Sequence, residues 1–233
     1  MLKELKERVY QANLDLVGHG LVFLTFGNAS GIDRRRGIVA IKPSGVGYEE
    51  MKPADIVLVD LDGRVVEGKL RPSSDTPTHL ALYRAFRTIG GIAHAHSEYA
   101  TMFAQAGHEI PCLGTTHADH FRGPVPVTRM ISKAEVEHDY EASIGKLIVE
   151  RFRRLDPMST PAVLVAGHGP FAWGGSPEDA VRNALVLELV AKMAFGTQVL
   201  APGRGPLSVH LLHRHFERKH GPRATYGQKA AKE

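Results

Sequence analysis

Three short polar motifs place the tightest constraint on how this chain can fold, because together they carry enough ligands for one metal ion. They are Pro72-Ser73-Ser74-Asp75-Thr76-Pro77, His94-Ala95-His96 and Gly167-His168-Gly169. One carboxylate and three imidazoles suit Zn²⁺, with Mn²⁺ or Co²⁺ as alternatives. Because the motifs lie far apart in the sequence, a shared metal requires a fold that brings the three motifs together.

Each candidate ligand also has a simpler interpretation. His94 and His96 alternate along an expected strand and leave the same face, which offers two nitrogens to one ion but is weak evidence alone. His168, between two glycines, could be a turn histidine bonded to backbone. Asp75 could cap the helix expected to begin at Thr76. The metal interpretation therefore depends on the four residues in combination.

Three polar loops could form a pocket for an anion. They are Gly27-Asn28, Ser44-Gly45 and Ser73-Ser74, and each offers backbone N–H groups beside a small hydroxyl or amide. The third loop lies at the expected start of a helix, where the dipole favours a phosphate, and Lys42 adds charge beside the second. Taken singly, each loop is an ordinary polar turn, so only their convergence indicates an anion site. A metal beside a phosphate-sized site points to chemistry on a sugar phosphate.

The pattern of apolar residues predicts helices and short strands mixed along the chain. Expected helices span 2–18, 76–86, 97–106, 176–195 and 210–219, and expected strands span 21–25, 37–41, 56–61, 65–66, 92–96, 163–165 and 171–174. Residues 27–30 are expected as a turn, and Gly196 as the end of the fourth helix. With no repeat and no linker, these elements predict one layered α/β domain over residues 1–233, with a short basic tail from about residue 227.

Charge and cysteine content narrow the class of protein. The formal net charge of +4 and the pI of about 9.2 are a mild excess that fits an anionic substrate, and no nucleic-acid reader motif accompanies it. Cys112 is the only cysteine, so no internal disulfide is possible, and we expect it to be a small buried apolar residue. The N-terminus lacks the apolar core of a signal peptide, and no apolar run approaches the roughly 18 residues of a membrane span. We therefore expect a cytoplasmic protein that binds neither nucleic acid nor membrane.

The order and spacing of six motifs resemble those of a known family. The motifs are Gly27-Asn28-Ala29-Ser30, Ile41-Lys42-Pro43-Ser44-Gly45-Val46, Pro72-Ser73-Ser74-Asp75-Thr76-Pro77-Thr78-His79, His94-Ala95-His96-Ser97, Gly114-Thr115-Thr116-His117-Ala118-Asp119 and Gly167-His168-Gly169-Pro170-Phe171-Ala172-Trp173-Gly174. This set resembles the class II aldolase/adducin-type family, and within it the branch of L-ribulose-5-phosphate 4-epimerases. The resemblance runs from the first expected helix to Tyr226-Gly227-Gln228.

The resemblance implies a fold and a set of site residues. The family fold is a three-layer α/β/α single domain around a mixed, largely antiparallel sheet. The family's metal ligands fall on Asp75, His94, His96 and His168. Its phosphate-binding positions fall on Gly27, Asn28, Ser44, Gly45, Ser73 and Ser74. The acid/base pair of the epimerases falls on Asp119 and Tyr226, which are implied to reach in from the neighbouring subunit of a homotetramer.

The implied activity is metal-dependent interconversion of L-ribulose 5-phosphate and D-xylulose 5-phosphate, in arabinose, ascorbate or another pentose route. The C3–C4 bond breaks by retro-aldol cleavage and re-forms, and no nicotinamide cofactor is needed. Aspartate at position 75, where related fuculose-phosphate aldolases have glutamate, favours the epimerase. An L-fuculose-phosphate-type aldolase, a non-catalytic adducin-like binding module and a metal-dependent dehydratase stay open. His215 could orient Tyr226, touch substrate or lie at the surface.

Overall fold

The computed structural model describes residues 2–222 and 224–226, so the basic tail expected from residue 227 lies outside the described residues. The strands are β1 (Asn28–Asp33), β2 (Ile38–Ile41), β3 (Val57–Asp60), β4 (Val65–Glu67), β5 (Gly91–His94), β6 (Ala162–Leu164) and β7 (Pro170–Gly174). The helices are α1 (Leu2–Gly18), the short 3₁₀ helix η1 (Pro53–Asp55), α2 (Thr76–Ala85), α3 (Glu98–Ala106), α4 (Thr115–Ala118), α5 (Lys133–Arg151), α6 (Pro177–Leu200) and α7 (Val209–His220).

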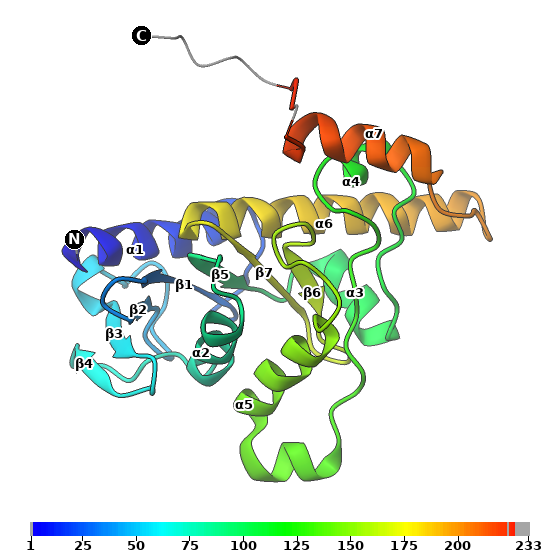
Figure 1. Ribbon diagram of the computed structural model, residues 1–233. Coiled ribbons are helices and arrows are strands. Elements are labelled where there is room, and N and C mark those ends of the chain that lie inside the picture. The colour runs from blue at the N-terminus through cyan, green and yellow to red at the C-terminus, as the bar shows by residue number, and fades with distance from the viewer. Residues whose placement is uncertain (1, 223, 227–233) are drawn as a thin grey trace, which may run out of the picture.

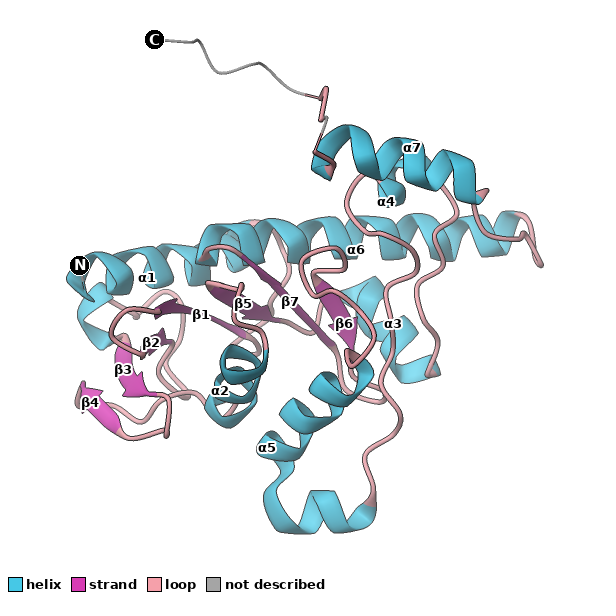
Figure 2. Cartoon of the chain, viewed as in Figure 1, coloured by secondary structure: helices cyan, strands magenta, loops and turns pink. Residues whose placement is uncertain are grey.

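One seven-stranded sheet forms the middle layer, in the order β4-β3-β2-β1-β5-β7-β6. All six pairings of neighbouring strands are antiparallel, and an isolated parallel bridge joins Val127 to Leu164. Helices α1, α3 and α6 cover one face, and α2 and α5 cover the other (Figures 1 and 2). The predicted three-layer α/β/α fold around a largely antiparallel sheet is therefore confirmed.

Side-chain size alternates along the central strands, so the two faces of the sheet carry different cores. Small residues face α1 and α6, namely Ala29, Ala40, Ala93 and Ala172. Larger residues face α2 and α5, namely Val39, Ile92, Phe171 and Trp173. The small-residue face lets two long helices lie close to the sheet, while the aromatic face fills the wider space under α2 and α5.

Two glycines allow the start of α6 to approach the sheet. A Cβ atom on Gly91 would lie 2.4 Å from the Pro177 nitrogen, and one on Gly174 would lie 2.4 Å from the Asp179 Cβ. Such distances are shorter than any real van der Waals contact, so a side chain at either position would push α6 outward. Ser176 caps the start of α6, as the sequence predicts. Its hydroxyl accepts a hydrogen bond from the Asp179 N–H.

The strand expected over 21–25 is wrong, and the turn expected over 27–30 is instead the start of β1. Leu24 and Gly27 both have positive φ angles, 53° and 89°, which interrupt an extended segment just before β1. The polar, small residues from Asn28 onward look like a turn in the sequence. They form a strand because β2 and β5 flank them on both sides and bury them.

Two helices also differ from expectation. Gly196 does not end α6, which continues to Leu200, since a single glycine costs a helix only about 1 kcal/mol. Helix α6 is also long and apolar enough to cross a membrane, although the sequence predicts no membrane span. In the structure it packs along β5 and β7. The sequence predicts no element between 107 and 161, where α4 and α5 lie. Helix α5 is kinked and its first half is polar, so its apolar residues do not show a helical pattern.

A buried asparagine ties α1 to β1. The Asn13 side chain has no solvent exposure. Its Nδ2 donates to the carbonyl oxygens of Val9 at 2.7 Å and Ala29 at 3.0 Å, and its Oδ1 accepts from the Ala29 N–H at 2.8 Å. Asn13 therefore satisfies backbone groups of β1 directly after Asn28, at the end of the strand where the candidate site begins.

We expect Asn13→Ala to lower the free energy of unfolding by about 1–3 kcal/mol, because the buried N–H and C=O of Ala29 lose their partner. Urea denaturation followed by circular dichroism measures the change. Gln11→Ala, on the exposed side of the same helix, is the matched control and should change stability by less than about 0.5 kcal/mol. Equal midpoints for the two variants would contradict the assigned role of Asn13.

Candidate active site

Three histidine rings meet where β5 ends and β7 begins. His94 is the last residue of β5, His96 lies just beyond the strand end, and His168 lies in the turn between β6 and β7. Their Nε2 atoms form a triangle with sides of 3.1, 3.2 and 3.3 Å. A tetrahedral zinc ion with Zn–N bonds of about 2.0–2.1 Å separates its nitrogen ligands by about 3.3–3.4 Å. The spacing therefore fits three ligands of one ion.

The surroundings of His96 and His168 favour neutral rings, which metal ligation requires. Burial, followed by the nearby His94 and His96 rings, lowers the pKa of His168 to about 4. Burial and the His94 ring also lower the pKa of His96. In His94 the Nδ1 atom lies 2.8 Å from the Pro170 carbonyl oxygen, which requires an N–H on that nitrogen. With its proton on Nδ1, a His94 ring that ligates a metal offers the lone pair of Nε2, toward the centre of the triangle.

Asp75 lies in the same pocket as the histidines, beside β1. It occupies the position before α2, but its side chain makes no capping hydrogen bond, so the helix-cap interpretation is not borne out. Its Oδ2 instead accepts a hydrogen bond of 2.6 Å from Asn28 Nδ2. Among the described residues, the ligand atoms that lie within 4.8 Å of one another are those of the three histidines. Asp75 as a fourth ligand therefore stays a prediction.

The ionisation of Asp75 reflects opposing influences. Burial favours the neutral acid, but the nearby His94 and His79 rings and the Asn28 hydrogen bond outweigh it and lower the pKa of Asp75. The group is therefore a carboxylate at neutral pH. A negative charge at this edge of the triad suits a cation at its centre.

All six residues expected to bind phosphate line one pocket together with Asp75 and the three histidines. The pocket has a volume of about 370 Å³, and the six residues are Gly27, Asn28, Ser44, Gly45, Ser73 and Ser74. The sequence predicted the loops and the histidines separately. Their meeting in one cavity is the feature that neither set could establish alone.

Hydrogen bonds between two of the loops change which groups are available to an anion. The Ser44 N–H donates to the Arg71 carbonyl at 2.9 Å, and the Ser73 N–H donates to the Lys42 carbonyl at 2.9 Å. These two N–H groups hold the loops together and are not free donors, contrary to the expectation from sequence. The serine hydroxyls and the residues that follow, Gly45 and Ser74, are therefore the groups placed to contact an anion.

The loop before β1 needs glycine at position 27. Gly27 has a φ of 89°, and a Cβ atom there would lie 2.7 Å from the His94 carbonyl oxygen. The Tyr48 hydroxyl donates to the Gly27 carbonyl at 2.8 Å. Close packing on one side and this hydrogen bond on the other fix the loop beside the triad.

Lys42 brings a buried positive charge to the pocket wall. The residue is 2% exposed. Its Nζ donates to the Val46 carbonyl at 2.7 Å and lies 4.6 Å from the centre of the Tyr48 ring. Burial lowers the pKa of Lys42, and no carboxylate in the described part of the chain forms an ion pair with it. An anion in the pocket would supply the missing countercharge.

Helix α4 packs on α7 (Figure 1). Asp119, at the C-terminal end of α4, and Tyr226 both contact Lys219 of α7. The Asp119 carboxylate accepts hydrogen bonds from His215 at 3.0 Å and from Arg218 at 2.8 and 3.1 Å. Burial alone would raise the pKa of Asp119, but these hydrogen bonds outweigh it and lower the pKa. The exposed Tyr226 ring lies over Lys219, 4.4 Å from its Nζ. Neither residue lines the pocket of its own chain.

Two further residues gain a place from the structure. His215 contacts Asp119. The sequence raises orientation of Tyr226 as one possible role of His215, and the contact found is with a different residue. Tyr140 was missed: its hydroxyl lies 2.9 Å from His168 Nδ1. No local sequence signal distinguishes Tyr140 from the other tyrosines, because its contact depends on a helix that was not predicted.

Cys112 is buried, as expected, and burial raises its pKa to about 11.

Known proteins resemble this chain in both sequence and fold. The family described as Class II Aldolase and Adducin N-terminal domain matches residues 7–195. A protein of Salmonella paratyphi A with the name L-ribulose-5-phosphate 4-epimerase UlaF is 54% identical over 228 residues, which cover 98% of this chain and 100% of the relative. The protein of that name from Salmonella typhi has the same identity and coverage.

Solved structures lead to the same family. An L-fuculose 1-phosphate aldolase superposes with a TM-score of 0.78 at 28% identity, over 92% of this chain and 95% of that one. The l-fuculose-1-phosphate aldolase of Thermus thermophilus superposes with a TM-score of 0.63 at 26% identity, over 88% and 98%. From the family match and the relatives of full length, this chain belongs to the class II aldolase and adducin family.

Proposed function

We propose that this chain is a metal-dependent epimerase that interconverts L-ribulose 5-phosphate and D-xylulose 5-phosphate. The observation that carries the proposal is the single cavity in which the histidine triad and the three polar loops share their walls. Such a cavity suits a phosphorylated ketose whose carbonyl end meets a metal and whose phosphate meets the loops. The relatives named as this epimerase, identical at 54% of positions over their full length, support the same activity.

The residues of the cavity divide into two roles. A divalent ion held by His94, His96 and His168, with Asp75 beside it, would supply a Lewis acid for the negative charge that develops on the ketose oxygens. Three nitrogens and a carboxylate suit Zn²⁺ best, with Mn²⁺ and Co²⁺ as alternatives. The hydroxyls of the serine loops and Lys42 bind the phosphate and hold it while the reacting carbon turns over.

Proton transfer falls to Asp119 and Tyr226 of a neighbouring subunit. One of them takes the proton from the C4 hydroxyl as the C3–C4 bond breaks and an aldehyde forms. The aldehyde carbon then presents its other face, the bond re-forms, and the second group returns a proton to the new alkoxide. Inversion at C4 requires a proton-transfer group on each side of that carbon. A cytoplasmic homotetramer with sites between subunits would satisfy this requirement.

A second candidate is an aldolase that releases its aldehyde, which the likeness to L-fuculose 1-phosphate aldolase favours. The two activities differ in products. We expect L-ribulose 5-phosphate with Zn²⁺ or Mn²⁺ to give D-xylulose 5-phosphate in a coupled assay, without accumulation of dihydroxyacetone or glycolaldehyde phosphate. Accumulated fragments would favour the aldolase. A purified protein that binds metal but does not turn over L-ribulose 5-phosphate would favour the adducin-like binding module.

His96→Ala should lose metal and activity together, because it removes one corner of the nitrogen triangle. Elemental analysis of the purified protein measures the metal content, and the coupled assay measures turnover. His138→Ala is the matched control, because this exposed histidine of α5 makes no side-chain hydrogen bond in the described structure. Full metal occupancy in His96→Ala would remove this residue from the ligand set.

Asp119→Asn and Tyr226→Phe should each lower kcat by about 10²–10⁴-fold, the usual contribution of a positioned acid or base. Both variants should keep full metal content, because neither residue lines the metal pocket of its own chain. Steady-state kinetics and elemental analysis on the same preparations test both statements. Near-normal turnover in the two variants would defeat the assignment.

Mixing two inactive variants tests whether sites form between subunits. In a mixed assembly of His96→Ala and Tyr226→Phe chains, some sites combine an intact triad from one chain with an intact Tyr226 from the other. We expect unfolding and refolding of the mixture to recover a substantial fraction of activity, while each variant refolded alone stays inactive. Unchanged inactivity of the mixture, with assembly confirmed by light scattering, would place both residues in one chain's site.

A further inference from the structure

One histidine of the triad is held by a side chain outside the pocket. The hydroxyl of half-buried Tyr140 lies 2.9 Å from His168 Nδ1, on the far side of the ring from the triangle of Nε2 atoms. The two ring centres are 6.2 Å apart and the planes are inclined at 45°, so the rings meet through this hydroxyl rather than by stacking. Tyr140 therefore contacts His168 through one directional hydrogen bond.

The direction of this hydrogen bond decides whether His168 can ligate a metal. If the Nδ1–H donates to the Tyr140 oxygen, the neutral ring keeps its lone pair on Nε2, toward His94 and His96. If instead the hydroxyl donates to Nδ1, the neutral ring carries its proton on Nε2, where it would occupy the position of the ion. Metal ligation thus requires Tyr140 to act as the acceptor, as the Pro170 carbonyl does for His94.

A break in α5 brings Tyr140 to this position. Asp139 has extended backbone angles, φ −159° and ψ 86°, and divides the helix into two halves. Tyr140 is the first residue after the break. The second half packs against α2 so closely that a Cβ atom on Gly145 would lie 2.6 Å from the Ala81 Cβ. The element that carries Tyr140 is therefore anchored to the body of the domain.

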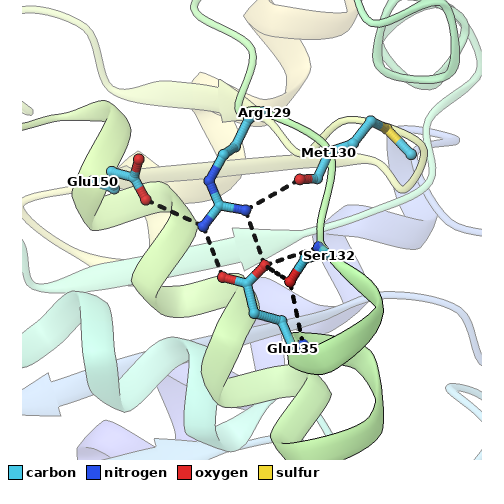
Figure 3. Close-up of polar contacts among 5 residues, drawn as sticks. All are labelled: Arg129, Met130, Ser132, Glu135 and Glu150. Atoms are coloured by element: carbon cyan, nitrogen blue, oxygen red, sulfur yellow. Dashed lines mark hydrogen bonds and ion pairs between the residues drawn. The ribbon is translucent and has the colours of Figure 1, made fainter.

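An arginine spans the break from outside, as Figure 3 shows. Arg129 donates to Glu135, before the break, at 2.7 and 2.9 Å, and lies 3.4 Å from Glu150, after it. Glu135 also accepts hydrogen bonds from the N–H and hydroxyl of Ser132, which caps the helix. These contacts connect the two halves across the break on the exposed side of the helix.

We propose that Tyr140 is a positioning residue of the metal centre, which fixes the ring orientation and the metal-binding tautomer of His168 by accepting its Nδ1–H. The inference rests on the metal site of the proposed function, but not on the reaction carried out there. His168 lies in a glycine-flanked turn, where the backbone alone restrains its ring least. The hydroxyl of Tyr140 supplies the restraint that this turn lacks.

Tyr140→Phe should weaken Zn²⁺ binding by about 10–100-fold, the usual cost of removing a hydrogen-bond partner of a metal-ligating histidine. Competition with a chromophoric chelator measures the affinity without substrate. The absorption bands of the Co²⁺-loaded variant should also shift, because the geometry of one ligand changes. Thermal unfolding of the metal-free protein should be unchanged, since the substitution keeps the ring and its packing.

Tyr99→Phe is the matched control, because the Tyr99 ring packs on Phe195 and Lys192 and its hydroxyl makes no hydrogen bond in the described part of the chain. It should bind Zn²⁺ as the unmodified protein does. If the unmodified protein binds no metal, the proposed function itself is contradicted. Normal metal binding by Tyr140→Phe, or a loss matched by early unfolding of its metal-free form, would overturn the positioning role alone.

Discussion

The hydrogen bonds on the two sides of β5 determine how the histidine triad lies relative to the loop before β1. On one side His94 is paired with Asn28 of β1, and on the other with Phe171 of β7. The first pairing sets the polar loop before β1 beside the His94 ring, and the second brings the turn that carries His168 next to it. A slip of one residue in either register would turn His94 toward the opposite helix layer and separate the triad from the loops.

Charge connects the parts that this register brings together. Burial lowers the pKa values of His96 and His168, and the same pocket holds the buried Lys42 and one carboxylate, Asp75. A divalent ion and a phosphate of charge about −2 would then add equal and opposite charge. Each would lower the cost of burying the other, because the metal site and the serine loops share one cavity of low dielectric. Binding of the ion and the phosphorylated substrate should therefore be mutually favourable.

The sequence predicted most of this site but not the means by which it is supported. Asp75, the histidines and the polar loops could be found because ligand types beside turn residues leave a local pattern. The strand at 28–33 could not, because Asn28 and Ser30 have turn-forming character and only pairing on both sides makes them a strand. Tyr140 depends on a break in α5 and on a contact with a turn distant in the sequence, and neither leaves a local signal. The ends of elements and the contacts between them are set by packing, which a pattern of single residues does not record.

On the proposed function, the separation of Asp119 and Tyr226 from the pocket of their own chain is explained by the requirements of inversion at C4. The elements around the triad, β1, β5 and the turn at His168, contribute to one cavity, and on the proposed function their side chains bind the metal and the phosphate. A proton-transfer group on the opposite side of the substrate must therefore come from another element. On this proposal the α4–α7 unit supplies that group: Arg218 and His215 donate hydrogen bonds to Asp119, and these bonds lower its pKa. On the proposed assembly, metal binding is a property of each chain, whereas epimerisation is a property of two chains together, so the activity should disappear on dilution into monomers before the metal does.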